Sequence, residues 1–229
     1  MTHAGAAYDR WLRRSVSGRL YSLLTTLPAQ ILVNTPAFGL HQELQLKPES
    51  LVLDVGCGSG ALLQALAARV RFRRPPVGID PSGAMLALGR ARPGVRLLRG
   101  TGASLPFAEA TFDAVICAHV VKHLADAELL TLLREVRRVL VPGGLAVVWE
   151  FAPTGNAWLD RWNRWLVTLG VKECTLRGYR DLSALALEAG FDWVANAHLR
   201  PFLYPPVPRV SVILGKAPPG WVREQLGAG

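Results

Sequence analysis

From Leu51 onward, short apolar runs alternate with segments of helical periodicity, and this alternation limits the possible folds more than any other feature. We expect strands at 51–55, 77–80, 95–98, 114–117, 145–149, 196–202 and 210–214, with a Pro-Gly-Gly turn at 142–144. We expect helices at 61–68, 82–88, 126–140, 156–166 and 181–190. Short apolar runs without polar alternation are typical of strands buried on both faces. Strand–helix alternation therefore predicts an α/β fold, a mainly parallel sheet with helices on both faces.

The residues at four expected helix starts are suitable N-caps, because a short polar side chain can accept a hydrogen bond from an unpaired backbone N–H of the first turn. Ser82, Asp126, Asn156 and Asp181 hold these positions. Gly190 is expected to end the last of these helices, since glycine readily adopts the left-handed conformation.

One domain is expected to occupy residues 49–217. Residues 1–48 are predicted to be a helical lead-in, because apolar residues recur there at roughly helical spacing with arginines between them. Residues 218–229 are expected to form a C-terminal tail.

The charge balance is strongly basic, with a formal net charge of +9 in 229 residues. A basic chain favours anionic partners such as nucleic acid, an acidic membrane surface or an acidic substrate. Ordinary arginine usage on a solvated surface explains the charge equally well, because no aromatic RNA-binding motif accompanies it. Three cysteines without a CxxC pair, and no signal-peptide or membrane-spanning pattern, make the cytoplasm the expected location.

The sequence DVGCGSG at 54–60 joins the first expected strand to the first helix. Its glycines allow a sharp turn and a close approach of a ligand to the backbone. Ligands of open α/β sheets bind at the carboxyl ends of the strands, and a helix N-terminus there favours an anionic group. The glycines fall at 56, 58 and 60 instead of in the GxGxxG spacing of nicotinamide and flavin enzymes. Asp80 closes the second strand, where an acidic residue can take ribose hydroxyls, so a nucleoside-type cofactor is predicted.

The motif LDVGCGSG at 53–60 resembles the first motif of class I S-adenosylmethionine-dependent methyltransferases. Further segments resemble later motifs of that family in the same order, at 77–82, 100–107, 112–117, 138–144 and 188–191. The resemblance spans 50–215 and implies a Rossmann-like seven-stranded sheet whose last strand is antiparallel to the rest. It also implies S-adenosyl-L-methionine as the cofactor and S-adenosyl-L-homocysteine as the product.

The same resemblance implies a set of cofactor-binding residues. They are Asp54, Gly56, Cys57, Gly58, Gly60, Asp80, Pro81, Met85, Thr101, Gly102, Ala103, Ala118 and His119. Thr101 departs from the family, which usually has an acid there, but its hydroxyl can still accept a hydrogen bond from the adenine amino group. Cys57 is expected to be a small loop residue and not a nucleophile. No metal is predicted, because the sulfonium methyl group is already electrophilic.

Two histidines follow the fourth expected strand. On a helix His119 and His123 would share a face like half of a metal site, but no nearby carboxylate or cysteine pattern completes one. His123 stands where many relatives have a histidine before a Leu/Val-Pro-Asp-like turn, which makes it a candidate base for the acceptor. A structural histidine that caps this turn is the alternative.

Two segments outside the motifs are candidates for contacts with the acceptor or with lipid. Relatives often begin with a Tyr-Asp segment like Tyr8-Asp9, so this segment is a candidate lid and Tyr8 a candidate catalytic residue. Simple packing of an amphipathic helix is the alternative. The basic N-terminal helix suits peripheral contact with a membrane surface. The Trp-rich helix at 156–166 could line an apolar acceptor pocket, contact lipid or pack in the core.

The motif set resembles the broad subgroup that contains quinone C-methyltransferases and phospholipid N-methyltransferases, and EFAP at 150–153 is similar to the quinone group. We therefore expect an enzyme that moves a methyl group directly, in line, to a small or lipophilic acceptor: quinone-like, phospholipid-like or a secondary metabolite. A non-catalytic S-adenosylmethionine-binding regulatory or scaffold protein is one alternative. An RNA methyltransferase is another, motivated by the positive charge, although no Asn/Asp-Pro-Pro-Tyr-type motif follows the fourth strand.

Overall fold

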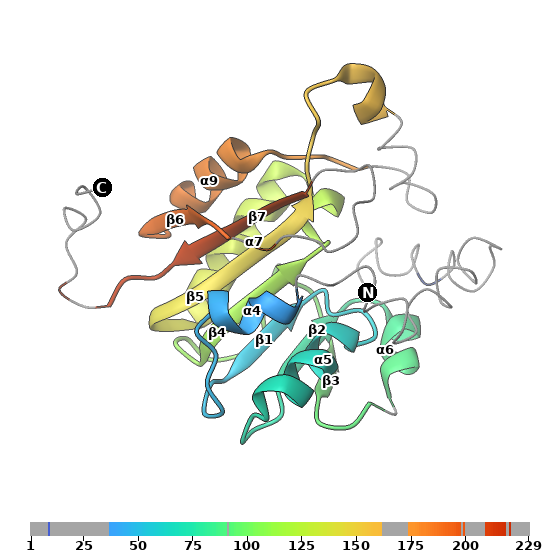
Figure 1. The fold of residues 1–229 in the computed structure, drawn as a ribbon, viewed down its shortest axis with the longest axis vertical. Coiled ribbons are helices and arrows are strands. Elements are labelled where there is room, and N and C mark those ends of the chain that lie inside the picture. The colour runs from blue at the N-terminus through green and yellow to red at the C-terminus, as the bar shows by residue number, and fades with distance from the viewer. Residues whose placement is uncertain are drawn as a thin grey trace.

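Seven strands form a single sheet in the order β3-β2-β1-β4-β5-β7-β6 (Figure 1). The strands are β1 (Val52–Val55), β2 (Val77–Asp80), β3 (Arg96–Arg99), β4 (Phe112–Ala118), β5 (Leu140–Phe151), β6 (Trp193–Asn196) and β7 (Arg209–Gly215). The neighbours from β3 to β5 pair in parallel, whereas β7 is antiparallel to both β5 and β6. The predicted mostly parallel sheet with an antiparallel last strand is therefore confirmed. This computed structural model describes residues 9, 37–90, 92–161, 174–197, 199, 209–218 and 220.

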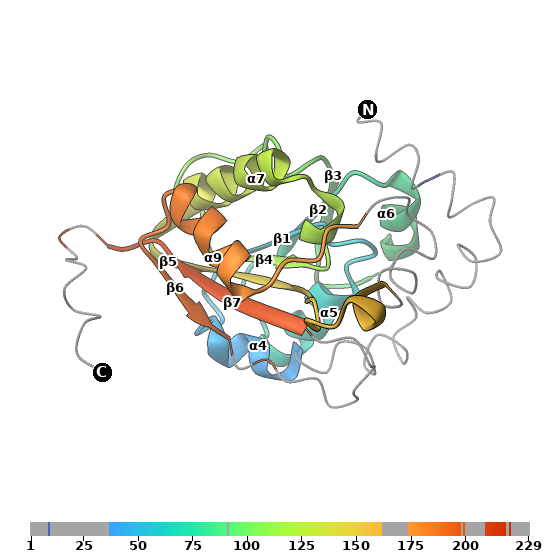
Figure 2. The same cartoon turned by 90° about the horizontal axis from the view of Figure 1, so that it is seen from above.

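Helices cover both faces of the sheet (Figure 2). The described helices are α4 (Ala37–Glu43), α5 (Ala61–Val70), α6 (Gly83–Gly89), α7 (Asp126–Val139) and α9 (Tyr179–Glu188), with a 3-10 turn η1 (Val121–His123). Figure 2 shows α7 and α9 on one face and α4 and α5 on the other, while α6 packs beside β2 and β3. Within the described residues, no helix is long and apolar enough to cross a membrane.

The alternate residues of β4 show why its sequence is apolar throughout. Val115 and Cys117 belong to the core under α7 and α9, whereas Ala114 and Ile116 belong to the core under α4 and α5. All four side chains are at most 1% exposed. A strand covered on both faces has no solvent-facing row of residues, so the polar alternation of an exposed sheet is missing.

Two of the four predicted N-caps are confirmed. The Ser82 hydroxyl accepts a hydrogen bond from the backbone N–H of Met85 at 3.1 Å. The Asn156 side chain accepts from the N–H groups of Trp158 and Leu159 at 3.0 and 3.2 Å. The part of the Trp-rich helix beyond 161, with most of its tryptophans, lies outside the described residues.

The other two predicted caps are wrong by one and three residues. The N-caps are Ala125 and Gly178, and Asp126 and Asp181 lie inside their helices. In each helix an acidic residue at the third position accepts a hydrogen bond from the N–H of the N-cap residue. Glu128 accepts from Ala125, and Asp181 accepts from Gly178, both at 2.9 Å. An acidic side chain can therefore satisfy the first turn from within the helix, and the sequence does not distinguish this from a true cap.

The fifth strand begins at Leu140, earlier than predicted. The Pro-Gly-Gly segment at 142–144 lies within this strand and does not end it. Leu140 pairs with Phe112, and the next described pair joins Leu145 to Ala114, so residues 141–144 form a bulge. A stop and turn at 142–144 with a strand start at Leu145 was predicted, but residues 140–151 form one continuous strand, so this prediction is wrong.

The sixth strand lies upstream of its predicted position at 196–202. It runs over Trp193–Asn196 and follows α9 after a turn in which Gly190 has φ +97°. The indole of Trp193 lies over Gly215 of β7, where a Cβ atom would meet the ring at 1.9 Å. This packing fixes the pairing of β6 with β7, and only a residue without a side chain fits opposite the indole. The other described helices and strands for which bounds were predicted agree with the structure to within two residues, whereas α4 and η1 had no predicted bounds.

Candidate functional site

The glycine loop (residues 56–60) follows β1 at the edge of the sheet where the parallel strands end. Gly56, Gly58 and Gly60 have φ values of +77°, +55° and +73°, in the left-handed region that favours glycine. A Cβ atom on Gly56 would lie 2.2 Å from Cγ2 of Val120, which follows β4. The predicted sharp turn is therefore confirmed, and Gly56 has no room for a side chain.

Asp80 ends β2 and joins the glycine loop to α6. One of its carboxylate oxygens accepts from the N–H of Gly58 and the other from that of Ser82, both at 2.8 Å. The side chain is buried, and burial raises its pKa while the two N–H groups lower it by a smaller amount. The structure thus brings Asp80 to the glycine loop, as the sequence predicted.

Asp54 lies in β1 directly before the loop and is 2% exposed. Its burial, reinforced by the nearby charge of Asp80, raises the pKa of Asp54 to about 8. The same burial and the same two carboxylates raise the pKa of the Cys57 thiol. Cys57 is therefore a neutral thiol, in agreement with its predicted role as a small loop residue.

The predicted adenine-contact segment follows β3 and lies beside the end of β2. The N–H of Gly100 donates to the carbonyl of Asp80 at 3.1 Å, and Thr101 forms an isolated bridge with Ser104. A Cβ atom on Gly102 would lie 2.4 Å from a methyl group of Leu132, so the segment packs tightly on α7. Met85 of α6 approaches the loop from the same side and is buried. The structure gathers the predicted residues of 54–103 along the ends of β1, β2 and β3.

His119 directly follows β4 and lies among aromatic side chains. Its φ is +60°, and its N–H donates to the carbonyl of Trp149 at 2.8 Å. Its ring lies 4.9 Å, centroid to centroid, from both the Trp149 and Phe151 rings. We call His119, Trp149 and Phe151 the aromatic cluster.

His119 and His123 do not share a helix face. His119 precedes η1 in a left-handed backbone conformation, and His123 ends η1 with an exposed side chain. No group of three metal-ligating side chains occurs among the residues that the structure describes.

Tyr8 lies outside the described residues, but its neighbour Asp9 reaches the site. The Ser82 hydroxyl and the N–H of Ala84 donate to Asp9, the second at 3.3 Å. The lead-in therefore contacts the start of α6, beside Asp80.

Sequence reasoning missed a set of charged residues around the aromatic cluster. Glu150 of β5 is fully buried and pairs with Lys122 of η1, whose Nζ lies 3.3 Å away. Arg209, which begins β7, places its guanidinium 5.4 and 5.3 Å from the Trp149 and Phe151 ring centroids. A glutamate at the end of an apolar strand was the available clue to this set. Its partners come from elements far apart in the chain.

Comparison with known proteins places these observations among methyltransferases. Residues 52–144 match a family model described as a methyltransferase domain. A 2-phytyl-1,4-naphtoquinone methyltransferase of Thermosynechococcus vestitus is 32% identical over 169 residues, which cover 69% of this chain and 72% of that protein. A probable tRNA methyltransferase 9B of Homo sapiens is 34% identical over 107 residues, but these cover only 22% of its length.

Among solved structures, the chain is similar to a methyltransferase in complex with the Haloferax volcanii Trm112 methyltransferase activator. The TM-score is 0.71 at 17% sequence identity, over 92% of this chain and 97% of the other. At this identity the likeness concerns the fold alone.

Proposed function

Because the chain belongs to the class I S-adenosylmethionine-dependent methyltransferases, we propose that its acceptor is a small lipophilic molecule of the quinone class. The observation that carries this proposal is the aromatic cluster at the ends of β4 and β5, where His119 directly precedes Val120, the residue that packs against Gly56. Aromatic side chains bind flat apolar rings through offset or edge contacts. The relative from Thermosynechococcus vestitus, named for a naphthoquinone substrate, supports the same class.

The described residues fit S-adenosylmethionine at the glycine loop. The Gly56 backbone lies so close to Val120 that a Cβ atom on Gly56 would overlap it. The buried Asp80 carboxylate accepts a hydrogen bond from the N–H of Gly58 in the loop. We propose that Asp80 takes the ribose hydroxyls, that Thr101 lies at the adenine, and that the N-terminus of α5 holds the carboxylate end. The bound cofactor supplies an electrophilic methyl group.

The protein's own contribution to such a transfer is orientation and exclusion of water. Val120 and Met85 close on the glycine loop from two sides, and both are apolar. His119 and Phe151, the partly exposed members of the aromatic cluster, would hold the acceptor ring beside them. Correct placement of two reactants can lower a barrier by about 7–11 kcal/mol at most, so placement alone is a sufficient role for most of these residues.

The acceptor class can be tested with S-adenosylmethionine that carries an isotopically labelled methyl group. The purified protein is incubated separately with a reduced short-chain demethylnaphthoquinone, with phosphatidylethanolamine vesicles and with tRNA. We expect label in the quinol fraction alone. Label in tRNA with a steep loss at higher salt would instead support nucleic-acid methylation. Tight cofactor binding with no labelled product would support a regulatory protein.

A further inference from the structure

Four charged or titratable side chains meet at the aromatic cluster, and we call them the charged cluster: His119, Lys122, Glu150 and Arg209. Glu150 is its centre and accepts from the backbone N–H of Lys122 at 3.2 Å and from that of Phe151 at 2.9 Å. Its Oε1 lies 3.3 Å from Lys122 Nζ and 3.5 Å from His119 Nδ1. Burial would raise the pKa of Glu150, but Lys122 and His119 outweigh it and lower this pKa to about 2. Glu150 is therefore an anion at every physiological pH.

The backbone of His119 is hydrogen-bonded, whereas its ring nitrogens are not fully satisfied. Lys122 Nζ donates to the carbonyl of His119, which supports the left-handed backbone at that residue. Nδ1 lies 3.5 Å from Glu150 Oε1, and both Nδ1 and Nε2 are buried without a geometrically good hydrogen bond to the described residues. An unsatisfied buried polar atom costs about 1–3 kcal/mol. Such atoms and such backbone conformations occur preferentially at functional sites.

The charges around His119 come from three elements. Lys122 and His123 lie on η1, Glu150 on β5 and Arg209 on β7.

We propose that His119, oriented by Glu150, removes a proton from an acidic hydroxyl of the acceptor, so that the acceptor is a hydroxy-arene such as a quinol. This inference rests on the proposed function and narrows its substrate class. A carboxylate that faces one nitrogen of a histidine leaves the other nitrogen to act as the base.

The proton and electron balance of this step is complete. The hydroxyl proton moves to His119 Nε2, and the electron pair of the oxyanion is shared with the ring. The oxygen or a ring carbon of the acceptor forms the new bond to the methyl group, while the S–CH3 bond breaks and leaves its electron pair on sulfur. If carbon is methylated, that carbon then loses its hydrogen as a proton and the hydroxyl is restored. No oxidant or metal is required.

The surroundings of His119 favour the neutral imidazole that a general base requires. Burial lowers the pKa of His119, and Lys122 and Arg209 lower it further, while Glu150 opposes them. Activity should therefore fall on the acid side as His119 becomes protonated. Removing Glu150 should shift this fall to lower pH, and removing Lys122 should shift it to higher pH.

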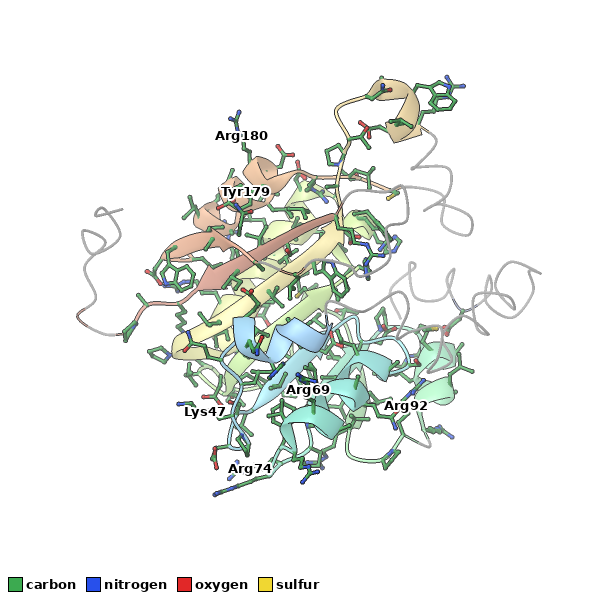
Figure 3. The ribbon with its side chains drawn as sticks, in the orientation of Figure 1. Lys47, Arg69, Arg74, Arg92, Tyr179 and Arg180 are labelled. Carbon is green, nitrogen blue, oxygen red and sulfur yellow. The ribbon has the colours of Figure 1, made fainter. Side chains whose placement is uncertain are left out.

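The test measures kcat against pH for the wild type, Glu150→Gln and Lys122→Met with a reduced demethylnaphthoquinone. Opposite shifts of the acid limb are the expected result, and a structural role would not produce them. Unshifted limbs in folded variants, or shifts in the same direction, would overturn the inference. The exposed Arg180→Gln on α9, which Figure 3 shows projecting away from the sheet, is the control for loss of a surface charge.

A second measurement remains decisive if both buried variants unfold. We expect His119→Asn to lower kcat about 100-fold or more, as for loss of a general base. The loss of kcat should be smaller with acceptors whose ring substituents make the hydroxyl more acidic, because such a hydroxyl gives up its proton more readily without a base. A loss that is the same for every acceptor would overturn the inference, as would a full loss in His123→Gln with none in His119→Asn. The kcat is measured at saturating S-adenosylmethionine, so that a change in cofactor affinity does not enter it.

The two proposals fail in distinguishable ways. If the wild type labels no quinol but labels another acceptor, the proposed substrate class is wrong. If the wild type labels the quinol and His119→Asn labels it equally well at every pH, only the role of His119 is wrong.

Discussion

Among single residues, Gly56 depends most strictly on the absence of a side chain. Its φ of +77° disfavours any L-residue by about 1–2 kcal/mol. Its Cβ position also overlaps Val120. We expect Gly56→Ala to lower the free energy of unfolding by about 2 kcal/mol or more and cofactor affinity at least about tenfold. Chemical denaturation and calorimetry with S-adenosylhomocysteine measure the two effects.

Gly143 provides the matched control for this substitution. It has φ +85°, but nothing lies within 4 Å of its Cβ position. Gly143→Ala should therefore cost only the backbone strain, about 1–2 kcal/mol, and leave cofactor affinity unchanged. Equal losses of affinity in both variants would show that the contact with Val120 is not what shapes the loop.

The raised pKa of Asp54 predicts that cofactor binding is linked to proton release. Burial and the charge of Asp80 raise this pKa to about 8, so Asp54 is mostly protonated at pH 7 when no cation is nearby. The sulfonium and ammonium groups of the cofactor favour the ionised carboxylate and lower its pKa. Binding should therefore release a proton below about pH 8, and affinity should rise with pH up to that point.

Calorimetry in buffers of different ionisation enthalpy counts the released protons. Asp54→Asn cannot ionise and should bind more weakly above pH 8, without the rise. A wild-type affinity that is independent of pH between 5 and 8 would contradict the proposed place of Asp54 beside the cofactor.

At the scale of elements, Arg177 connects the segment before α9 to η1 and to the start of α7. Its guanidinium is buried and donates to the carbonyls of Val121 and Leu124 at 2.8 and 2.7 Å. It also donates to the Asp126 carboxylate at 2.9 and 2.7 Å. The Asp126 side chain is 72% exposed, so this ion pair contributes little and the carbonyl contacts carry most of the effect.

We expect Arg177→Met to lower the free energy of unfolding by about 1–3 kcal/mol, because the Leu124 carbonyl loses its donor while the Val121 carbonyl keeps the N–H of Leu124. Arg177→Lys should not restore this stability, since an ammonium group lacks the planar arrangement of five N–H donors of a guanidinium. The control is Arg180→Met, two helical positions into α9 and exposed. Similar melting temperatures for the two variants would refute the role of Arg177.

The sequence predicts elements well where each one carries its own pattern, and less well where pairing decides. β1, β2 and β4 are apolar runs next to helices of clear periodicity, so their type and order could be predicted. The extension of β5 past its bulge depends on the pairing of Leu140 with Phe112, and β6 depends on the fit of Trp193 over Gly215. No local pattern encodes either contact.

The candidate site divides in the same way. The glycine loop and Asp80 lie in recognisable motifs, and the structure places them together. Glu150 and Lys122 are 28 residues apart and meet only because β4 and β5 are neighbours in the sheet. The charge on a buried strand end was visible in the sequence, but its partners follow from strand order and register.

At the scale of the whole molecule, both halves of the site receive residues from distant parts of the chain. Arg209 reaches the aromatic cluster from the last strand, and Asp9 reaches the start of α6 from the lead-in. The half that would hold the cofactor is thus contacted by Asp9, and the half that would hold the acceptor is contacted by Arg209. We propose that the lead-in acts as a lid over the cofactor.

The Asp9 contact offers a direct test of this lid. Asp9 accepts from the Ser82 hydroxyl, which itself accepts from the N–H of Met85, so the lead-in is connected to the helix cap beside Asp80. Loss of such hydrogen bonds should lower cofactor affinity about 3- to 10-fold in Asp9→Ala. The sheet does not depend on Asp9, so the melting temperature should change little.

Glu49→Ala is the control, because Glu49 forms an exposed ion pair with Arg73 before β1, at the opposite edge of the sheet. If Asp9→Ala binds as tightly as Glu49→Ala, the lead-in does not cover the cofactor. If instead only Asp9→Ala loses affinity, and mainly through faster dissociation of S-adenosylhomocysteine, the lead-in acts as a lid that must open for product release.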